Sequence, residues 1–193
     1  MLSLEESLKI LKETKALIEG HFILSSGLHS PKYVQCAQLM SKPSQAAQIC
    51  QSLAKKIKIE YNNIDLILSP AMGGIVIGYE IGKLLGVETI FSERVNGKFQ
   101  LRRDFKIKQD TNVLIVEDVI TTGKSSIECS NLVKVNKANI VGYACIIDRS
   151  DGKTEINDKI ISQIKLNIPT YKKENLPKEL ISIDPVKPGS RNL

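Results

Sequence analysis

The run Val113-Leu114-Ile115-Val116 places the tightest limit on how this chain can fold. Consecutive aliphatic residues of this kind predict a strand buried on both faces, as in parallel sheets that are covered by helices. Two acids, Glu117 and Asp118, follow the run directly, and then come two threonines, a glycine and a hydroxyl-rich helix start. A buried strand that leads through a polar loop into a helix is typical of α/β proteins.

The rest of the chain repeats this alternation of strands and helices. Helices are predicted from the capping box at Ser3 and Glu6 to Gly20, from Pro43 onward, over 73–85 and from about Gly123 to Val135, and strands over 64–70, 88–91 and 139–147. The alternation implies an α/β fold with a parallel central sheet, flanked by helices that form right-handed crossovers. A length of 193 residues predicts a single domain, 1–193.

The composition limits which partners the protein can bind and which cellular compartment suits it. A net charge of +6 and a pI near 9.1 allow either a nucleic acid or a small anionic substrate. The four cysteines lack C-x-x-C spacing and the chain has two histidines, so a zinc site is not expected. Because no signal peptide or bilayer-spanning apolar run is visible, we expect a reduced, cytoplasmic protein that does not associate with membranes.

The segment from Glu117 to Ser125 indicates a site for a phosphorylated sugar. Its "GKS" ending is similar to a P-loop, but that motif needs a glycine at the position of Asp118, where a carboxylate would repel a nucleotide's phosphates. A ribose 5-phosphate fits better. The backbone N–H groups from Thr121 to Ser125 and the hydroxyls of Thr121, Thr122 and Ser125 can hold the phosphate. Glu117 and Asp118 can accept hydrogen bonds from the ribose hydroxyls and stabilise positive charge at the anomeric carbon.

The same segment resembles the phosphoribosyl-pyrophosphate signature of the type I phosphoribosyltransferases, an apolar run followed by two acids and a T-T-G-x-S loop. Three further segments resemble the orotate phosphoribosyltransferase family in particular. "GHFILSSGLHSPKYVQ" (20–35) is similar to its N-terminal hood, "FSERVNGKFQLRRDF" (91–105) to its mobile catalytic loop, and "IPTYKKENLPKELISIDPVKPGSR" (168–191) to the C-terminal tail of one bacterial branch. The resemblance covers nearly the whole chain.

The resemblance implies a fold, a reaction and a set of site residues. The fold is the type I phosphoribosyltransferase fold with a small hood from about residues 1–40, and the reaction converts orotate and phosphoribosyl pyrophosphate into orotidine 5-phosphate and pyrophosphate. Mg²⁺ is the implied cofactor, held mainly by substrate without direct side-chain ligands. The phosphoribosyl pyrophosphate site comprises Arg94, Lys98, Glu117, Asp118, Val119, Ile120, Thr121, Thr122, Gly123, Lys124 and Ser125, and the pyrophosphate loop comprises Ala71, Met72, Gly73 and Gly74.

The segment 93–110 resembles the family's lid, which in that family enters the neighbouring subunit's site. The segment carries six basic and three acidic residues, so half of the chain's net charge lies on it. We therefore expect a homodimer whose lid neutralises the departing pyrophosphate, with Lys98, Arg102 and Arg103 as catalytic residues beside Asp118. Two departures from the enteric pattern stand out: Ser25 occupies the position of a hood lysine, and the lid has no histidine.

The resemblance also implies which residues bind orotate: Ser26, Thr121 and Arg149. Arg149 could instead form a surface ion pair with Asp148 or Asp151. Two other functions share parts of the pattern. A purine phosphoribosyltransferase has the same signature over 113–126, although the hood and the tail argue against it. A regulator that binds phosphoribosyl pyrophosphate and a nucleic acid is compatible with the pI, but no nucleic-acid-binding motif is visible, and we expect no nucleic-acid partner.

Overall fold

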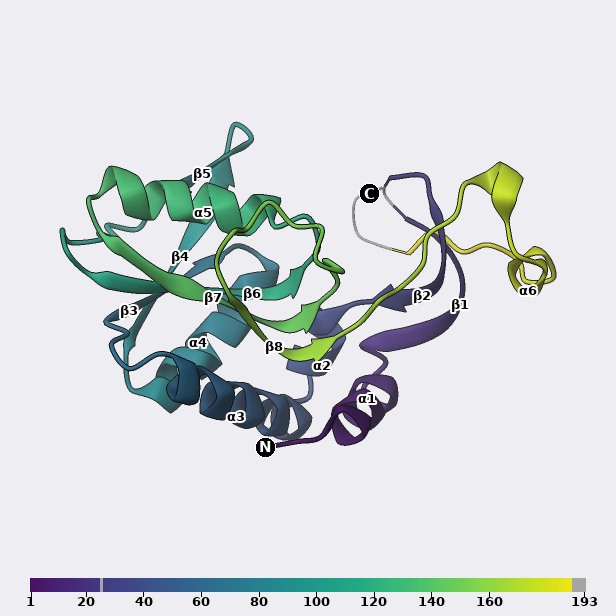
Figure 1. The fold of residues 1–193 in the computed structure, drawn as a ribbon, viewed down its shortest axis with the longest axis horizontal. Coiled ribbons are helices and arrows are strands. Elements are labelled where there is room, and N and C mark those ends of the chain that lie inside the picture. The colour runs from purple at the N-terminus through teal and green to yellow at the C-terminus, as the bar shows by residue number, and fades with distance from the viewer. Residues whose placement is uncertain (25, 189–193) are drawn as a thin grey trace.

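The computed structural model describes residues 1–24 and 26–188. A six-stranded sheet with the order β5-β4-β3-β6-β7-β8 forms its centre (Figure 1). The strands are β3 (Leu66–Pro70), β4 (Glu88–Val95), β5 (Lys98–Leu101), β6 (Asn112–Ile120), β7 (Asn139–Asp148) and β8 (Ile160–Lys165). All neighbouring strands are parallel except β4 and β5, which form an antiparallel hairpin. The predicted α/β class with a parallel central sheet is confirmed.

Helices cover both faces of this sheet, because its central strands are apolar on both sides. α3 (Pro43–Glu60) and α4 (Gly73–Leu85) lie on one face and α5 (Lys124–Val135) on the other (Figure 1). Alternate residues of β6 divide between two cores: Leu114 and Val116 pack with the first face, and Val113 and Ile115 pack with α5. This two-sided burial is what the run of aliphatic residues predicted.

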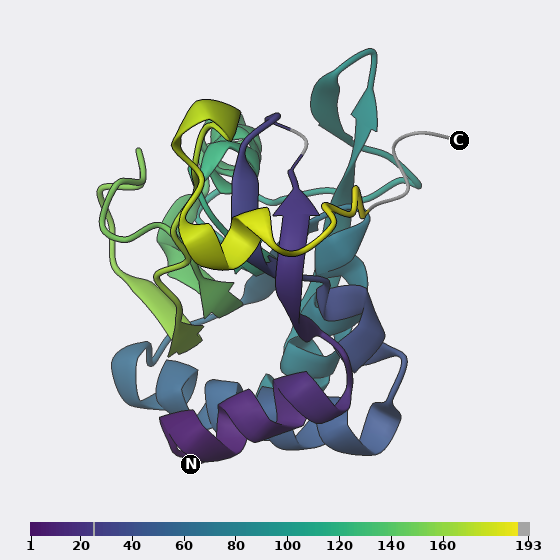
Figure 2. The same cartoon turned by 90° about the vertical axis from the view of Figure 1, so that its right-hand side faces the viewer.

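A small second layer lies at the carboxyl edge of the sheet. β1 (Leu17–Ile23) and β2 (His29–Val34) form an antiparallel pair, followed by the short helix α2 (Cys36–Met40). The C-terminal segment, with η1 (Lys173–Asn175) and α6 (Lys178–Ile181), runs along this pair (Figure 2). Bridges between Phe22 and Val186 and between His29 and Tyr171 join the two segments. The predicted hood is therefore present, although Ser25 and the tail end 189–191 lie outside the described residues.

The first helix is shorter than predicted. α1 (Leu4–Glu13) begins at the expected capping box, in which Ser3 and Glu6 bond each other's backbone N–H groups. It ends before Gly20, because Lys15 adopts a left-handed φ of 57° and the chain then turns into β1. Leu17, predicted to lie on the helix, is a buried strand residue instead. Within the described residues, none of the helices has the length and apolar character needed to cross a bilayer.

Candidate active site

Two adjacent strands each lead into a helix whose first turn is open to an anion. β3 precedes α4 and β6 precedes α5, and β3 and β6 are parallel neighbours. Neither helix has a side-chain N-cap or an acidic residue in its first turn. The unpaired N–H groups of a helix N-terminus favour negative charge. The loop 71–74, predicted to hold pyrophosphate, and the loop 117–125, predicted to hold the 5-phosphate, thus lie side by side.

Gly123 fixes the shape of the second loop. Its φ is 79°, and a Cβ at this position would lie 2.4 Å from the Thr154 hydroxyl. Thr154 Oγ1 and Glu155 N both donate hydrogen bonds to the Thr122 carbonyl, at 3.1 and 3.3 Å. The loop is therefore held by the segment after β7. Ile120 is buried, so its side chain belongs to the core and its backbone alone faces the loop.

Glu117 carries a partly buried carboxyl group. Burial raises the pKa of Glu117 to about 7, against the opposing effect of the Ser126 hydroxyl, which donates a hydrogen bond to Oε2. The neighbouring negative charge of Asp118 raises the Glu117 pKa further, and Arg94 lowers it. A carboxyl group held near neutrality can change charge state when a ligand binds.

Asp118 lies against the pyrophosphate loop. A Cβ built on Gly73 would be 2.6 Å from Asp118 Oδ2, so the absence of a side chain at Gly73 permits the approach. Burial raises the pKa of Asp118, and backbone hydrogen bonds oppose the rise. Asp118 therefore lies next to the loop 71–74, and the roles predicted for the acid pair stay predictions.

A cavity of about 1860 Å³ lies between the sheet edge, the hood and the tail. Three predicted orotate contacts, Ser26, Thr121 and Arg149, line it together with Met72 and Gly73 of the pyrophosphate loop. Segments far apart in the chain thus meet at one site. Sequence reasoning missed several other lining residues, namely Tyr33, Gln35, Lys153, Asn167, Thr170 and Lys187. Tyr33 and Gln35 lie in the hood segment, and Thr170 and Lys187 lie in the tail segment. The resemblance of these two segments to the family indicated the region of the site but not these individual residues.

Arg149 lies in the wall of this cavity, and it is the cation that was predicted to contact the base. Its backbone N–H donates to the Ile120 carbonyl at 2.8 Å, which fixes it beside the loop of 117–125. Within the described residues Arg149 forms no ion pair with Asp148 or Asp151. Asp151 lies near Lys153 at 3.8 Å, and Asp148 accepts from the Ser150 N–H. The buried Nε of Arg149 has no hydrogen-bond partner there. Burial lowers the pKa of Arg149, but a guanidinium stays charged.

The predicted lid is a β-hairpin. Asn96 and Gly97, with φ values of 50° and 79°, form the turn between β4 and β5. An Asn-Gly pair between two strands is a strong hairpin signal, and sequence reasoning did not use it. Arg94 pairs with Glu128 of α5 at 2.7 Å and stacks 4.1 Å above the Phe99 ring.

The remaining lid cations differ in their pairing. Arg103 donates two hydrogen bonds to the carboxylate of Glu93, at 3.1 and 3.0 Å. Lys98 and Arg102 are not fully buried, and neither has a hydrogen bond or ion pair within the described residues. No residue of the segment 93–110 lines the large cavity of the same chain.

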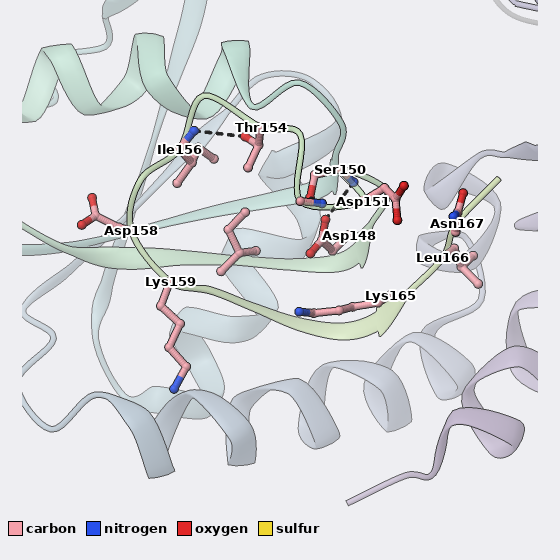
Figure 3. Close-up of a pocket in the computed structure, with 12 residues that line it drawn as sticks. Asp148, Ser150, Asp151, Thr154, Ile156, Asp158, Lys159, Lys165, Leu166 and Asn167 are labelled. Atoms are coloured by element: carbon pink, nitrogen blue, oxygen red, sulfur yellow. Dashed lines mark hydrogen bonds between the residues drawn. The ribbon is translucent and has the colours of Figure 1, made fainter. Parts of the chain in front are cut away.

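A second cavity, of about 690 Å³, adjoins the first beneath the segment after β7 (Figure 3). Ser150, Asp151 and Asn167 line both cavities. Asp148, Asp158 and Lys165 add charged groups to the smaller one (Figure 3). Because Arg149 and Thr121 do not line it, the smaller cavity is separate from the predicted base contacts.

Comparison with known proteins identifies the class and then the family. Residues 40–177 match the phosphoribosyl transferase domain family, so this is a phosphoribosyltransferase domain. The chain is 46% identical to the orotate phosphoribosyltransferase of Methylorubrum extorquens over 190 residues, 98% of this chain and 97% of the relative. It is 44% identical to that of Parvibaculum lavamentivorans, over 98% of both chains. The chain belongs to the orotate phosphoribosyltransferase family.

Similarity to solved structures supports the fold, but it does not indicate which base the protein uses. The orotate phosphoribosyltransferase of Aeropyrum pernix matches with a TM-score of 0.72 and 23% identity, over 82% of this chain and 92% of that chain. An adenine phosphoribosyltransferase from Thermoanaerobacter pseudethanolicus also matches, with a TM-score of 0.60 and 20% identity, over 70% of this chain and 88% of that one. Enzymes named for different bases thus share the fold, and the family assignment rests on full-length sequence identity. The predicted role of each site residue stays a prediction.

Proposed function

We propose that this protein transfers the phosphoribosyl group of phosphoribosyl pyrophosphate to orotate, giving orotidine 5-phosphate and pyrophosphate in pyrimidine biosynthesis. Family membership supports the reaction. The observation that carries the choice of orotate is Arg149, which lines the large cavity and has a buried, unpartnered Nε. An unpaired buried donor is costly unless a ligand satisfies it, and a guanidinium fork matches the oxygens of a carboxylate or carbonyl.

We infer a task for each part of the site. The open N-terminus of α5 holds the 5-phosphate, and the open N-terminus of α4 with the small-residue loop 71–74 holds the pyrophosphate. Glu117 and Asp118 then face the ribose, where bond cleavage leaves an oxocarbenium-like charge. In their ionised forms the two carboxylates stabilise that charge.

We also infer that Mg²⁺ takes part, carried by the substrate. Within the described residues no three His, Cys, Asp or Glu side chains gather to hold a metal ion. The open helix N-termini hold phosphate oxygens, the hard ligands that Mg²⁺ prefers. The residues present therefore fit a metal that arrives with pyrophosphate, where it neutralises the charge of the leaving group.

We infer that the protein acts as a homodimer with the lid of one subunit at the site of the other. Two features support this arrangement. The lid residues do not line the cavity of their own subunit, and Lys98 and Arg102 have no partner in the described residues. In addition, Met72, Val76 and Tyr79 are exposed at helical spacing at the start of α4. A second copy of the chain would cover this apolar face. We place the enzyme in the cytoplasm, with which its four buried, unpaired cysteines, all in described residues, are compatible.

Replacing Arg149 tests the choice of base. Arg149→Ala should lower kcat/KM for orotate by about 10–100-fold, because a charge-assisted hydrogen bond is worth roughly 1.5–3 kcal/mol. Arg149→Lys, which keeps the charge but loses the planar fork, should recover little of this. Calorimetry should show unchanged binding of phosphoribosyl pyrophosphate to both variants. Unchanged orotate kinetics would remove Arg149 from the site, and efficient turnover of adenine by the wild type would overturn the choice of base.

A further inference from the structure

Ser126 lies beside the acid pair and is not among the site residues predicted from the sequence. It is the third residue of α5 and is fully buried. Its hydroxyl donates a hydrogen bond to Oε2 of Glu117, the acid at the end of the buried strand. A buried hydroxyl that bonds to a reacting carboxylate can control both its position and its charge.

The hydroxyl of Ser126 bonds to Glu117 because the backbone carbonyl that it would usually bind already accepts other hydrogen bonds. A serine near the start of a helix often donates to the carbonyl four residues earlier, which here is Thr122. That carbonyl already accepts hydrogen bonds from Thr154 Oγ1 and Glu155 N. One turn later, Ser130 does bond to the helix backbone, and it donates to the Ile127 carbonyl, three residues earlier, at 2.7 Å. Ser126 and Ser130 are thus two buried serines of one helix with different partners.

The surroundings of Glu117 leave few groups that favour its ionised form. Burial is the largest influence on the Glu117 pKa and raises it to about 7, and the Ser126 hydrogen bond is the largest influence in the opposite direction. Asp118 on the same strand raises the Glu117 pKa. Arg94 of β4 and the Ser125 hydroxyl each lower it by less than Ser126 does, and the Arg94 guanidinium is shared with Glu128.

The remaining neighbours of Glu117 that titrate are thiols. Cys129 of α5 and Cys145 of β7 both interact with the Glu117 charge. Burial raises the pKa of Cys129 to about 12 and raises that of Cys145 strongly, so both remain neutral near neutral pH. Neither thiol therefore offsets the burial of the carboxylate, and Ser126 is left as the principal stabiliser of its charge.

We propose that Ser126 is a positioning residue for phosphoribosyl transfer, which fixes the Glu117 carboxylate and keeps it ionised to accept hydrogen bonds from the ribose hydroxyls. The proposal rests on the proposed function, since it assumes that ribose occupies the space in front of Glu117. It predicts that removal of the hydroxyl acts through the charge state of Glu117. The loss of activity should then depend on pH.

The direction in which the pH profile of activity should shift follows from the charge state in which Glu117 works. Glu117 accepts hydrogen bonds when ionised, so activity should rise as the pH rises through the Glu117 pKa near 7. In Ser126→Ala the pKa is higher still, and the acidic limb of the pH profile should move upward by about one unit, because a charge-assisted hydrogen bond favours the ionised form roughly tenfold. At pH 7 we expect about a fivefold lower kcat/KM for phosphoribosyl pyrophosphate, because about half of the wild-type Glu117 but only about a tenth of the variant's would be ionised, with recovery toward pH 9.

Four variants separate this role from a structural one. Ser130→Ala removes an equally buried hydroxyl from the same helix and should leave the limb in place. Ser126→Thr keeps a hydroxyl and should restore the limb toward that of the wild type. Glu117→Gln should remove the limb, and adding Ser126→Ala to it should have no further effect on the profile. If Ser126→Ala lowers the rate equally at every pH, or lowers it further in the Glu117→Gln protein, the proposal is wrong.

A ligand-free measurement distinguishes this proposal from the proposed function. NMR of the protein labelled with ¹³C at glutamate carboxyl groups reports the titration of Glu117, assigned by its loss in Glu117→Gln. The midpoint should rise in Ser126→Ala and stay in place in Ser130→Ala, whether or not the protein turns over orotate. An unchanged midpoint in a folded Ser126→Ala protein would refute the inference even if the wild type is an active transferase.

Discussion

Gly73→Ala tests whether the approach of the pyrophosphate loop to Asp118 matters for catalysis. The new Cβ would lie 2.6 Å from Asp118 Oδ2 and 2.8 Å from Cγ, whereas ordinary contacts begin near 3.4 Å. The carboxylate must therefore move by about 0.8 Å. Misplacement of a reacting group by about 1 Å can cost about 100-fold in rate. We expect kcat/KM to fall by about 100-fold, which corresponds to about 2.7 kcal/mol of transition-state stabilisation.

The same substitution should affect folding little. Gly73 is the first residue of α4 and its φ lies outside the left-handed region, so alanine fits the backbone and adds about 0.5–1 kcal/mol of helix preference. The displaced group is the end of a side chain, which can turn without moving the backbone. Thermal unfolding should therefore give a Tm within a few degrees of the wild type.

Gly86→Ala is the matched control at the other end of α4. Gly86 has a left-handed φ of 76°, and a Cβ there meets nothing within 4 Å. Alanine should cost about 1 kcal/mol of stability through backbone strain and leave activity unchanged below the unfolding range. The reasoning fails if Gly73→Ala retains full activity, or if its activity falls only in proportion to its stability.

Three further perturbations address the acid pair, the lid and the tail. Asp118→Asn keeps the shape but removes the charge that faces the oxocarbenium, so turnover should fall by roughly 10²–10³-fold in a steady-state assay; wild-type turnover would exclude that role. Lys98→Ala and Asp118→Asn subunits, mixed and exchanged, should regain activity because a hybrid dimer has one site with both groups intact; inactivity after verified exchange would place the lid at its own subunit's site. His21 Nε2 lies 2.6 Å from His29 Nδ1, and His21 Nδ1 lies 2.8 Å from the Ile183 carbonyl. His21→Ala should therefore loosen the tail and speed its limited proteolysis about tenfold, and an unchanged cleavage rate would show that the histidine pair does not hold the tail.

The local structure at the centre of the candidate site could be predicted from the sequence, because its parts follow one another in the chain. The strand β6, the acids Glu117 and Asp118, and the glycine at the start of α5 follow one another in the chain. Each has a residue-level cause: aliphatic residues for a strand buried on two faces, and Gly123 for a left-handed φ. The parallel topology then follows, because strands that alternate with helices have few other ways to bury both faces.

Features that depend on distant partners could not be predicted in the same way. Leu17 fits a helical pattern with Leu4, Leu8 and Leu11, yet it lies in β1, whose pairing with β2 overrides local preference. The strand β8 was missed, since its place at the sheet edge is set by pairing with β7. Likewise, the burial that raises the Glu117 pKa comes from the assembled fold, and spacing in the sequence does not report it.

The ion pairs of the lid bear on how a ligand could close it. Arg103 is paired with Glu93, but its side chain is 59% exposed, and such exposed pairs are worth about 0–1 kcal/mol. Pyrophosphate carries a denser charge than one carboxylate, so we expect Arg103 to exchange partners at little cost, whereas Lys98 and Arg102 have no pair to break within the described residues. A ligand shifts a conformational equilibrium only through contacts that differ between its states. On the proposed function, phosphoribosyl pyrophosphate makes such contacts with the lid, so we expect the lid to close after it has bound.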